Sequence, residues 1–172
     1  QMDIQTKLKR NLEIIDILSE AYSSLFYFNF EDGSSGVITV SSELKDSITG
    51  LIASCEKLED VFKVFVLEQV HPDDRDLLLG IASRSFVAKQ LTHQKRFTVV
   101  FRHLYGSEYK YTRLVFAKAE AVNAPPKLVA VGFVEVDAQY KAEMEHQENM
   151  ERIVSLSDQF ETVYDVNIDT GL

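Results

Sequence analysis

The sequence predicts an α+β fold in which a five-stranded antiparallel sheet carries short helices on one face and is flanked by a helix at each end. Two strand-like segments enclose a turn near residue 33, three more follow residue 95, and helical spacing fills the interval between them. The 172 residues, of which 45% are hydrophobic, suffice for one domain with extensions.

The first predicted helix covers residues 4–24. Apolar residues recur there at alternating spacings of four and three, and Asn11 is the one polar position on this seam. Such a seam is typical of a coiled coil between two chains. The same spacing suits an amphipathic helix lying on the sheet of its own domain, and the sequence leaves both interpretations open.

The predicted strands lie at both ends of the domain. They cover residues 25–30, 36–40, 96–102, 109–122 and 128–136. The first two form a hairpin and the last three a meander, which the hairpin joins in a single sheet. Residues 43–91 lack strand alternation and instead repeat apolar residues at helical spacing, which predicts short helices.

The residues after the last strand predict a continuous exit helix. Between Asp137 and residue 160 there is no Gly or Pro, and Ala, Glu, Lys, Met and Gln dominate the first half. We expect Asp137 to be the N-cap of this helix and the junction through which a signal passes.

A repeat marks the end of the chain. Aligning Leu18 with Leu156 places Leu18–Phe26 on Leu156–Tyr164 and, after it, Phe28–Glu31 on Val166–Asp169. We interpret residues 150–172 as the beginning of a second copy of the same domain, up to and including its first strand. The alternative is a chance similarity between two helix-then-strand segments.

Composition limits the classes of function. A net charge of −9 opposes binding to nucleic acid. Cys55, the only cysteine, excludes an internal disulfide, suits a reducing cytoplasm and is expected to be a small, partly buried apolar residue. No apolar run reaches the ~20 residues that span a bilayer. We therefore expect a cytoplasmic segment of a longer protein, since the chain begins with Gln1, and that protein can carry a membrane anchor elsewhere.

The segment His71-Pro72-Asp73-Asp74-Arg75 has the pattern of a helix start. Proline suits the first helical position, and carboxylates in the first turn complement the free N–H groups. A metal site is the alternative, but adjacent aspartates point in different directions and no second His or Cys stands at ligand spacing. We expect no metal here.

With this "HPDDR" segment, residues 14–137 resemble a PAS domain of bacterial signalling proteins. The whole chain is similar to the paired PAS-like sensors of diguanylate cyclases (GGDEF proteins) and histidine kinases. The resemblance implies a linker helix over residues 1–13, the sensor domain over 14–137, and a linker helix plus the start of a second PAS-like repeat over 138–172.

Tested against the cofactor-binding members of that family, the sequence predicts no cofactor. Flavin-binding photosensors carry Asn-Cys-Arg-Phe, whereas Cys55 lies in Ala-Ser-Cys-Glu. Haem sensors use an axial histidine on a middle helix. His93 precedes a strand, His103 lies within one, and His146 belongs to the exit helix, so none is expected to be that ligand.

The resulting hypothesis is a sensory module without catalytic residues of its own, because no phosphate-binding loop or nucleophile elbow is present. Phe97, Phe101 and Tyr111 are the candidate lining of a pocket for an unidentified small molecule. We expect a homodimer and an output domain in the same chain, a GGDEF diguanylate cyclase, with a histidine kinase as the alternative. A ligand-free dimerisation or spacer module is the other hypothesis.

Overall fold

The computed structural model describes the backbone of residues 3–42, 44–54 and 58–169. Side chains of residues 47, 52, 54, 58 and 157–169 lie outside this description, and so does the expectation for Cys55. The chain divides into two units, residues 1–135 and residues 136–172. Within the described residues, no helix is long and apolar enough to cross a membrane.

Among the residues that the structure describes, the first unit holds all the strands and most of the helices. In chain order its elements are α1 (Ile4–Ser19), β1 (Ser24–Asn29), β2 (Ser35–Val40), α2 (Lys45–Ser54), α3 (Leu58–Gln69), the 3₁₀ turn η1 (Pro72–Asp74), α4 (Arg75–Ile81), α5 (Arg84–His93), β3 (Arg96–Tyr105), β4 (Glu108–Lys118) and β5 (Leu128–Glu135). The second unit contains the single helix α6 (Asp137–Asp169).

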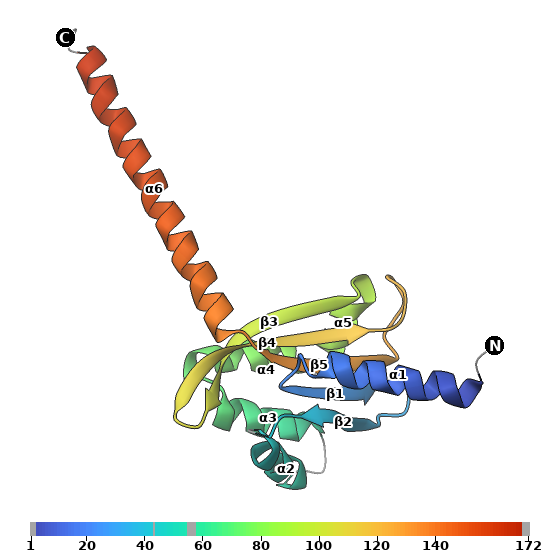
Figure 1. Ribbon diagram of the computed structural model, residues 1–172. Helices are drawn as coiled ribbons and strands as arrows, with labels where there is room; N and C mark the ends of the chain where they lie inside the picture. Colours follow the sequence, from blue (N-terminus) through green and yellow to red (C-terminus); the bar gives the residue numbers. More distant parts are fainter. Residues whose placement is uncertain (1–2, 43, 55–57, 170–172) are drawn as a thin grey trace. The chain divides into compact units, whose positions relative to one another are not determined.

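The five strands form one antiparallel sheet in the order β2-β1-β5-β4-β3 (Figure 1). The early hairpin and the late meander meet where β1 pairs with β5, from Ser24 opposite Phe133 to Asn29 opposite Leu128. This confirms the predicted α+β fold and the predicted joining of hairpin and meander. Residues 58–69, which lack strand alternation, are helical as expected.

The core lies between the inner face of the sheet and helices α2 to α5. Phe101 and Leu114 from the sheet, and Leu78 and Leu91 from the helices, are almost completely buried. On the outer face, the ring of Tyr22 lies over Gly132, and a Cβ at that glycine would come within 2.5 Å of ring atoms. Only glycine admits this close approach, which brings the segment after α1 onto β5.

Strand β4 is shorter than predicted. It ends at Lys118, paired with Val129, although apolar residues continue to Val122. The neighbouring strand β3 begins at Arg96, opposite Ala117, so residues beyond Lys118 have no strand partner on that side. The chain turns instead, with Asn123 in the left-handed region at φ 69°.

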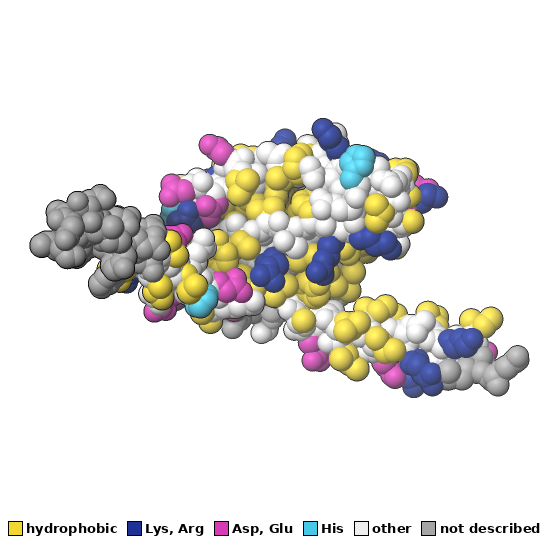
Figure 2. All heavy atoms as spheres, turned by 90° about the horizontal axis from the view of Figure 1, so that it is seen from above, with side chains coloured by type: hydrophobic (Ala, Val, Ile, Leu, Met, Phe, Trp, Pro, Cys, Tyr) yellow, Lys and Arg dark blue, Asp and Glu magenta, His cyan; other side chains and the backbone are white. Residues whose placement is uncertain are grey.

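Helix α1 does not lie on the sheet of its own domain, so that interpretation of its seam is wrong. It ends at Ser19 because the chain must extend before Ser24 enters the sheet. Residues 3–18 are all exposed, and the exposed fractions of Leu8 and Leu12 are 58% and 54%. Figure 2 shows these hydrophobic side chains along the helix at the lower right.

Helix α6 is longer than predicted and runs from Asp137 to Asp169. The first strand expected for the second copy, over residues 163–168 by alignment with residues 25–30, is therefore wrong. A strand needs a partner for its backbone hydrogen bonds, whereas a helix satisfies its own. The repeat itself stays a prediction, and Gly171 lies outside the described residues.

The N-cap expected at Asp137 lies one residue earlier. The carbonyl of Val136 accepts the first helical hydrogen bond, from Tyr140 N–H at 2.8 Å, which makes Val136 the cap residue. Asp137 occupies the first helical position and forms an ion pair with Lys141 at 2.9 Å. A carboxylate there still complements the positive end of the helix dipole.

Candidate functional site

An apolar cavity of about 70 Å³ lies between the inner face of the sheet and helices α2 and α3. Five aromatic side chains supply much of its lining: Phe26, Phe28, Phe62, Phe65 and Phe133. Aliphatic side chains from α2, α3 and β5 complete the apolar part. Ser24 and His103 are the polar residues of the lining, although the surface that the lining presents to the cavity is almost wholly apolar.

Local structure determines which side chains reach this cavity. Ser24, Phe26 and Phe28 alternate along β1, so all three project from its inner face. Phe62 and Phe65 stand three residues apart on α3, where helical spacing places them on one side of the helix. Alternation and helical periodicity therefore direct aromatic rings into the same space from opposite sides.

His103 is one of two buried polar residues in the lining of the cavity, the other being Ser24. Its exposed fraction is 3%, and its ring lies between Phe65, with centroids 5.2 Å apart, and Tyr105, at 4.6 Å. Its Nδ1 has no hydrogen-bond partner among the described residues. Burial lowers the pKa of His103 to about 4, because the charged imidazolium would lose its hydration. The imidazole is therefore neutral at physiological pH.

A larger cleft of about 460 Å³ adjoins the cavity and shares Phe28, Phe62 and Val131 with it. The cleft is more polar, since Arg84 and Glu59 also line it. The Arg84 guanidinium lies 5.0 Å from the centroid of the Phe30 ring and donates a hydrogen bond to the carbonyl of Phe30. The two spaces are therefore neighbours, one lined by apolar side chains and the other partly by charged ones.

The three predicted lining residues are not among those that line this cavity. Phe101 and its strand partner Thr112 face the core. Tyr111 precedes Thr112 and pairs with Arg102, so strand alternation places Tyr111 on the outer face. Phe101 is on the inner face but packs behind the cavity, against Phe65. Phe97 stacks on Phe116 with ring centroids 4.7 Å apart, farther along the core.

Sequence reasoning missed His103 although a signal was present. The inner-face pattern of Phe97, Val99 and Phe101 continues with the same period to residue 103. The predicted strand ended at Arg102, whereas β3 continues to Tyr105 and carries His103 into the core. The aromatic residues of β1 and α3 were recognised as strand and helix, but their convergence depends on tertiary packing.

The HPDDR segment, residues 71–75, forms the predicted helix start. Pro72 begins η1, and His71 Nδ1 accepts a hydrogen bond from the backbone N–H of Asp73 at 3.2 Å. Asp73 and Asp74 occupy the first turn, as expected. At the end of the segment, Arg75 Nε donates a hydrogen bond to the carbonyl of Val70 at 3.0 Å.

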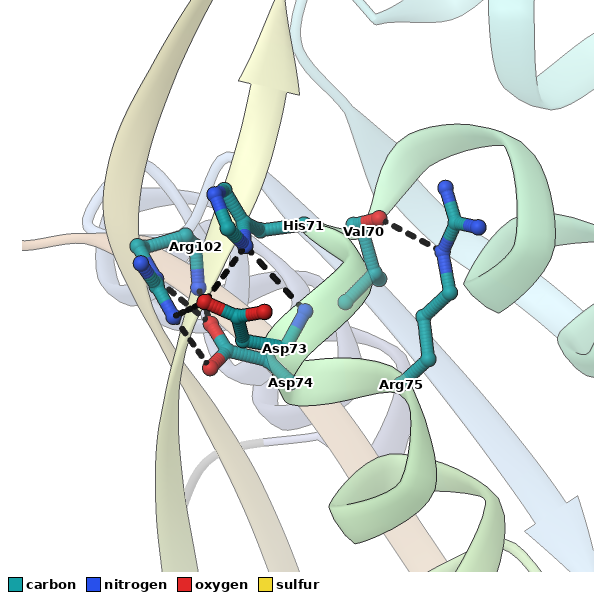
Figure 3. Close-up of polar contacts among 6 residues, drawn as sticks. All are labelled: Val70, His71, Asp73, Asp74, Arg75 and Arg102. Carbon is teal, nitrogen blue, oxygen red and sulfur yellow. Dashed lines mark hydrogen bonds and ion pairs between the residues drawn. The ribbon is translucent and has the colours of Figure 1, made fainter.

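The same segment fastens the edge of the sheet at Arg102 (Figure 3). The Asp74 carboxylate accepts the backbone N–H of Arg102 at 2.8 Å, its Nε at 2.9 Å and its Nη2 at 2.8 Å. The N–H of His71 donates to the carbonyl of Arg102 at 3.0 Å. Strand β3 is an edge strand, and these bonds satisfy backbone groups that would otherwise be open to other chains.

The contact between Asp74 and Arg102 shifts the pKa values of both side chains. The hydrogen bonds from the Arg102 side chain hold the pKa of Asp74 below its ordinary value, and those to Asp74 raise the pKa of Arg102. Both groups are therefore ionised over the physiological range. The backbone N–H of His71 and the backbone N–H and C=O of Arg102 are hydrogen-bonded as well. The HPDDR segment is therefore a structural fastener, which holds the edge of the sheet in place, and not a reactive site.

The order of elements around the cavity decides the fold. An N-terminal helix, a hairpin, short helices, a three-stranded meander and an exit helix follow one another, and hairpin and meander share one sheet. This is a PAS fold. The cavity lies under the sheet, next to the helices between hairpin and meander.

Solved structures similar to this chain are sensor domains. An RNA-binding Light-Oxygen-Voltage receptor has 10% identity and a TM-score of 0.43, and the match covers 78% of this chain and 33% of that chain. This chain thus spans about a third of the length of that receptor. A sensory box histidine kinase/response regulator from Burkholderia thailandensis has 14% identity and a TM-score of 0.42, with 81% and 96% covered.

A third similar structure is the N-terminal domain of a diguanylate cyclase with PAS/PAC sensor from Marinobacter aquaeolei. Its identity is 10% and its TM-score 0.42, and the match covers 68% of this chain and 97% of that chain. No protein-family model matches the chain, and no curated protein matches it.

Proposed function

We propose that this PAS domain senses a small molecule held in the cavity and relays its presence to an output domain in the same chain. The observation that carries the proposal is the buried His103, whose partnerless Nδ1 belongs to a residue that lines an apolar cavity. A buried polar atom without a partner destabilises a fold, and such groups are frequent at functional sites.

The route from cavity to output begins at β5. Val131 and Phe133 line the cavity, and the strand that carries them ends at Glu135, directly before α6. A ligand that displaces these side chains would move the last strand, and the helix joined to it is a rigid element suited to transmit a shift. Asp137, at the first position of α6, is the proposed signal junction.

The experiment is denaturing mass spectrometry of the purified chain, which detects a small molecule that co-purifies with it. We expect such a molecule with the wild-type chain and a reduced amount with Val61→Phe, which fills the cavity. Leu77→Phe, on α4 and 53% exposed, adds the same ring outside the cavity and serves as the control. Equal amounts in the filled variant and the wild type would contradict the proposal.

The output domain is proposed to be a GGDEF diguanylate cyclase, with a sensor histidine kinase as the alternative. The HPDDR segment resembles sensors of both classes, so it supports both outputs and does not distinguish between them. The full-length protein decides between them: formation of cyclic-di-GMP from GTP supports the first, and autophosphorylation from ATP supports the second. The domain is proposed to act in the cytoplasm and without nucleic acid.

A second candidate function is dimerisation. The exposed apolar side chains of α1, among them Ile4, Leu8 and Ile15, follow the predicted seam and lack cover within the first unit. We propose a homodimer through this seam and a second one near Met150–Phe160. Sedimentation should give a dimer at micromolar concentration, and Leu8→Glu should shift it toward monomer. A wild-type monomer at high micromolar concentration would contradict the dimer.

A further inference from the structure

The cleft beside the cavity has the size of a ligand site. Its volume of about 460 Å³ lies within the roughly 300–1,000 Å³ of small-molecule sites, whereas the cavity beneath the sheet holds about 70 Å³. Residues of the β1–β2 hairpin, of α3, of the first turn of α5 and of strands β4 and β5 line it. Unlike the cavity, the cleft presents polar as well as apolar surface. A molecule in the cleft can therefore be held through both kinds of group.

Aromatic rings form much of the apolar wall of the cleft. Phe28, Phe30, Phe62 and Phe116 line it, together with valines of α5 and β5. An engineered cavity of about 150 Å³ accepts benzene, so a cleft of about 460 Å³ can admit a ring that carries a short chain. Phenylalanine rings make favourable edge-to-face and offset contacts with another aromatic ring. The apolar wall therefore suits an aromatic body.

Arg84 places a positive charge at this wall. Its guanidinium lies 5.0 Å from the centroid of the Phe30 ring and donates a hydrogen bond to the Phe30 carbonyl, and both residues line the cleft. These two contacts hold the guanidinium at the wall. Among the described residues, no carboxylate forms an ion pair with Arg84. A guanidinium has further N–H groups in a planar fork that matches the two oxygens of a carboxylate, so Arg84 can receive one from a ligand.

Glu59 is the other charged residue among those that line the cleft. It forms no ion pair with Arg84 or with any other described cation, so the charge of Arg84 is not neutralised within the wall. A ligand with two carboxylates would bring the second one into the same cleft as Glu59, and like charges repel. The net charge of −9 opposes a dianion more strongly than a monoanion. The charges therefore favour a single carboxylate on the ligand.

We propose that the cleft binds an aromatic monocarboxylic acid as its anion, with the carboxylate paired to Arg84 and the ring against the phenylalanine wall. The cleft is treated as a separate site from the cavity, so the inference goes beyond the proposed sensory function and does not require the cavity to be occupied. Arg84 determines the preference for the acid over its uncharged amide. Glu59 determines the preference for one carboxylate over two, and the phenylalanine rings do not distinguish these ligands.

The test compares three probes that share one phenyl group on the 172-residue chain: 3-phenylpropanoate, 3-phenylpropanamide and benzylmalonate, all at pH 7.5. Amide NMR titrations give each dissociation constant and show which residues respond. We expect 3-phenylpropanoate to bind roughly tenfold more tightly than the amide, because a charge-assisted hydrogen bond is stronger than a neutral one. Benzylmalonate, which adds a second carboxylate to the same skeleton, should bind more weakly than 3-phenylpropanoate. The signals of Phe30 and Val129, which line the cleft, should shift.

Three variants make the test specific. Arg84→Gln removes the charge and should bring the acid and the amide to equal affinity, and the dispersion of its amide spectrum reports whether it is folded. Glu59→Gln should keep the preference for the acid and remove the disadvantage of benzylmalonate. Arg96→Gln removes an exposed arginine at the start of β3, outside the lining, and should keep both preferences. Should Arg84→Gln prove unfolded, Arg84→Lys, which retains the charge but not the planar fork, is expected to keep part of the preference for the acid.

The outcomes separate this site from the cavity. Equal binding of acid and amide to the wild-type chain, or binding of neither, overturns the inference. A preference for the acid that survives in Arg84→Gln overturns the assignment of Arg84, and shifts confined to residues outside the cleft overturn the site itself. The cavity is judged separately, by the molecule that co-purifies with Val61→Phe and with Leu77→Phe, so failure at one site does not decide the other.

Discussion

The burial of His103 predicts an acid-dependent loss of stability that a single substitution removes. In the folded chain its pKa falls from 6.5 to about 4 because the charged ring is desolvated. The unfolded chain therefore binds a proton below pH 6.5, whereas the folded chain does not until about pH 4. Lowering the pH through this window favours the unfolded state, and raising it restores stability.

The magnitude follows from the separation of the two pKa values. Each pH unit of separation corresponds to about 1.4 kcal/mol, so His103 makes the free energy of unfolding about 3 kcal/mol lower at pH 4 than at pH 7. His103→Leu, which cannot take up a proton, removes this dependence. The difference in slope between wild type and variant is greatest near pH 5.

Urea unfolding at a series of pH values from 4.5 to 7.5 measures the effect. Carboxylates such as Asp74, whose pKa is lowered, also weaken the fold in acid, but they do so equally in both proteins. The difference between the two therefore isolates His103. His93→Leu is the matched control and should follow the wild-type dependence. Parallel curves for wild type and His103→Leu would refute the reasoning.

The remaining predictions concern the fastener, the core and the signal junction. Asp74→Asn weakens the paired bonds to Arg102 and should lower the free energy of unfolding by about 2 kcal/mol, measured by urea unfolding. Leu78→Ala opens a cavity at a fully buried site and should cost about 2–5 kcal/mol in the same assay. Asp137→Ala removes a first-turn carboxylate and its ion pair with Lys141, so it should destabilise α6 by roughly 0.3–1 kcal/mol and weaken the output response.

Each of these has its own contradicting result. Unchanged stability in Asp74→Asn would mean that the sheet edge does not depend on the fastener. Leu77→Ala, at a half-exposed neighbouring position, should change stability little, so a cost equal to that of Leu78→Ala would contradict the burial argument. For Asp137→Ala, an output response to ligand equal to the wild type would remove α6 from the proposed route.

The fold was predictable because its strands and helices follow their own periodicities. Alternation located β1 to β5, and spacings of three and four located α3 and α4, since both patterns arise from which side chains face the core. Boundaries were less accurate where pairing decides them. Strand β4 stops at Lys118 because its neighbour on one side begins at Arg96, which no local pattern of residues 119–122 reveals.

The site was less predictable, because it depends on how separate elements meet. Phe26 lies on a strand and Phe65 on a helix, and each has the spacing of an ordinary core residue. Whether a space remains between their rings depends on the distance between the sheet and the helices. Tyr111 was assigned to the pocket for its aromatic ring, but alternation from Phe101 and Thr112 places it on the outer face.

Near the end of the chain, the sequence predicted a strand that the structure does not form. Residues 163–168 align with residues 25–30 in the internal repeat, and this alignment predicted a strand. Strand formation needs a partner, and the helix that is formed satisfies its backbone without one. The likeness of the two segments therefore bears on their origin more than on the structure that this segment adopts.

The account depends on a small molecule held in the cavity beneath the sheet, and denaturing mass spectrometry of the purified chain tests this most directly. A small molecule should co-purify with the wild-type chain, and Val61→Phe, which fills the cavity, should carry less of it than Leu77→Phe, which adds the same ring at an exposed position. Equal amounts in Val61→Phe and in the wild type would contradict the account.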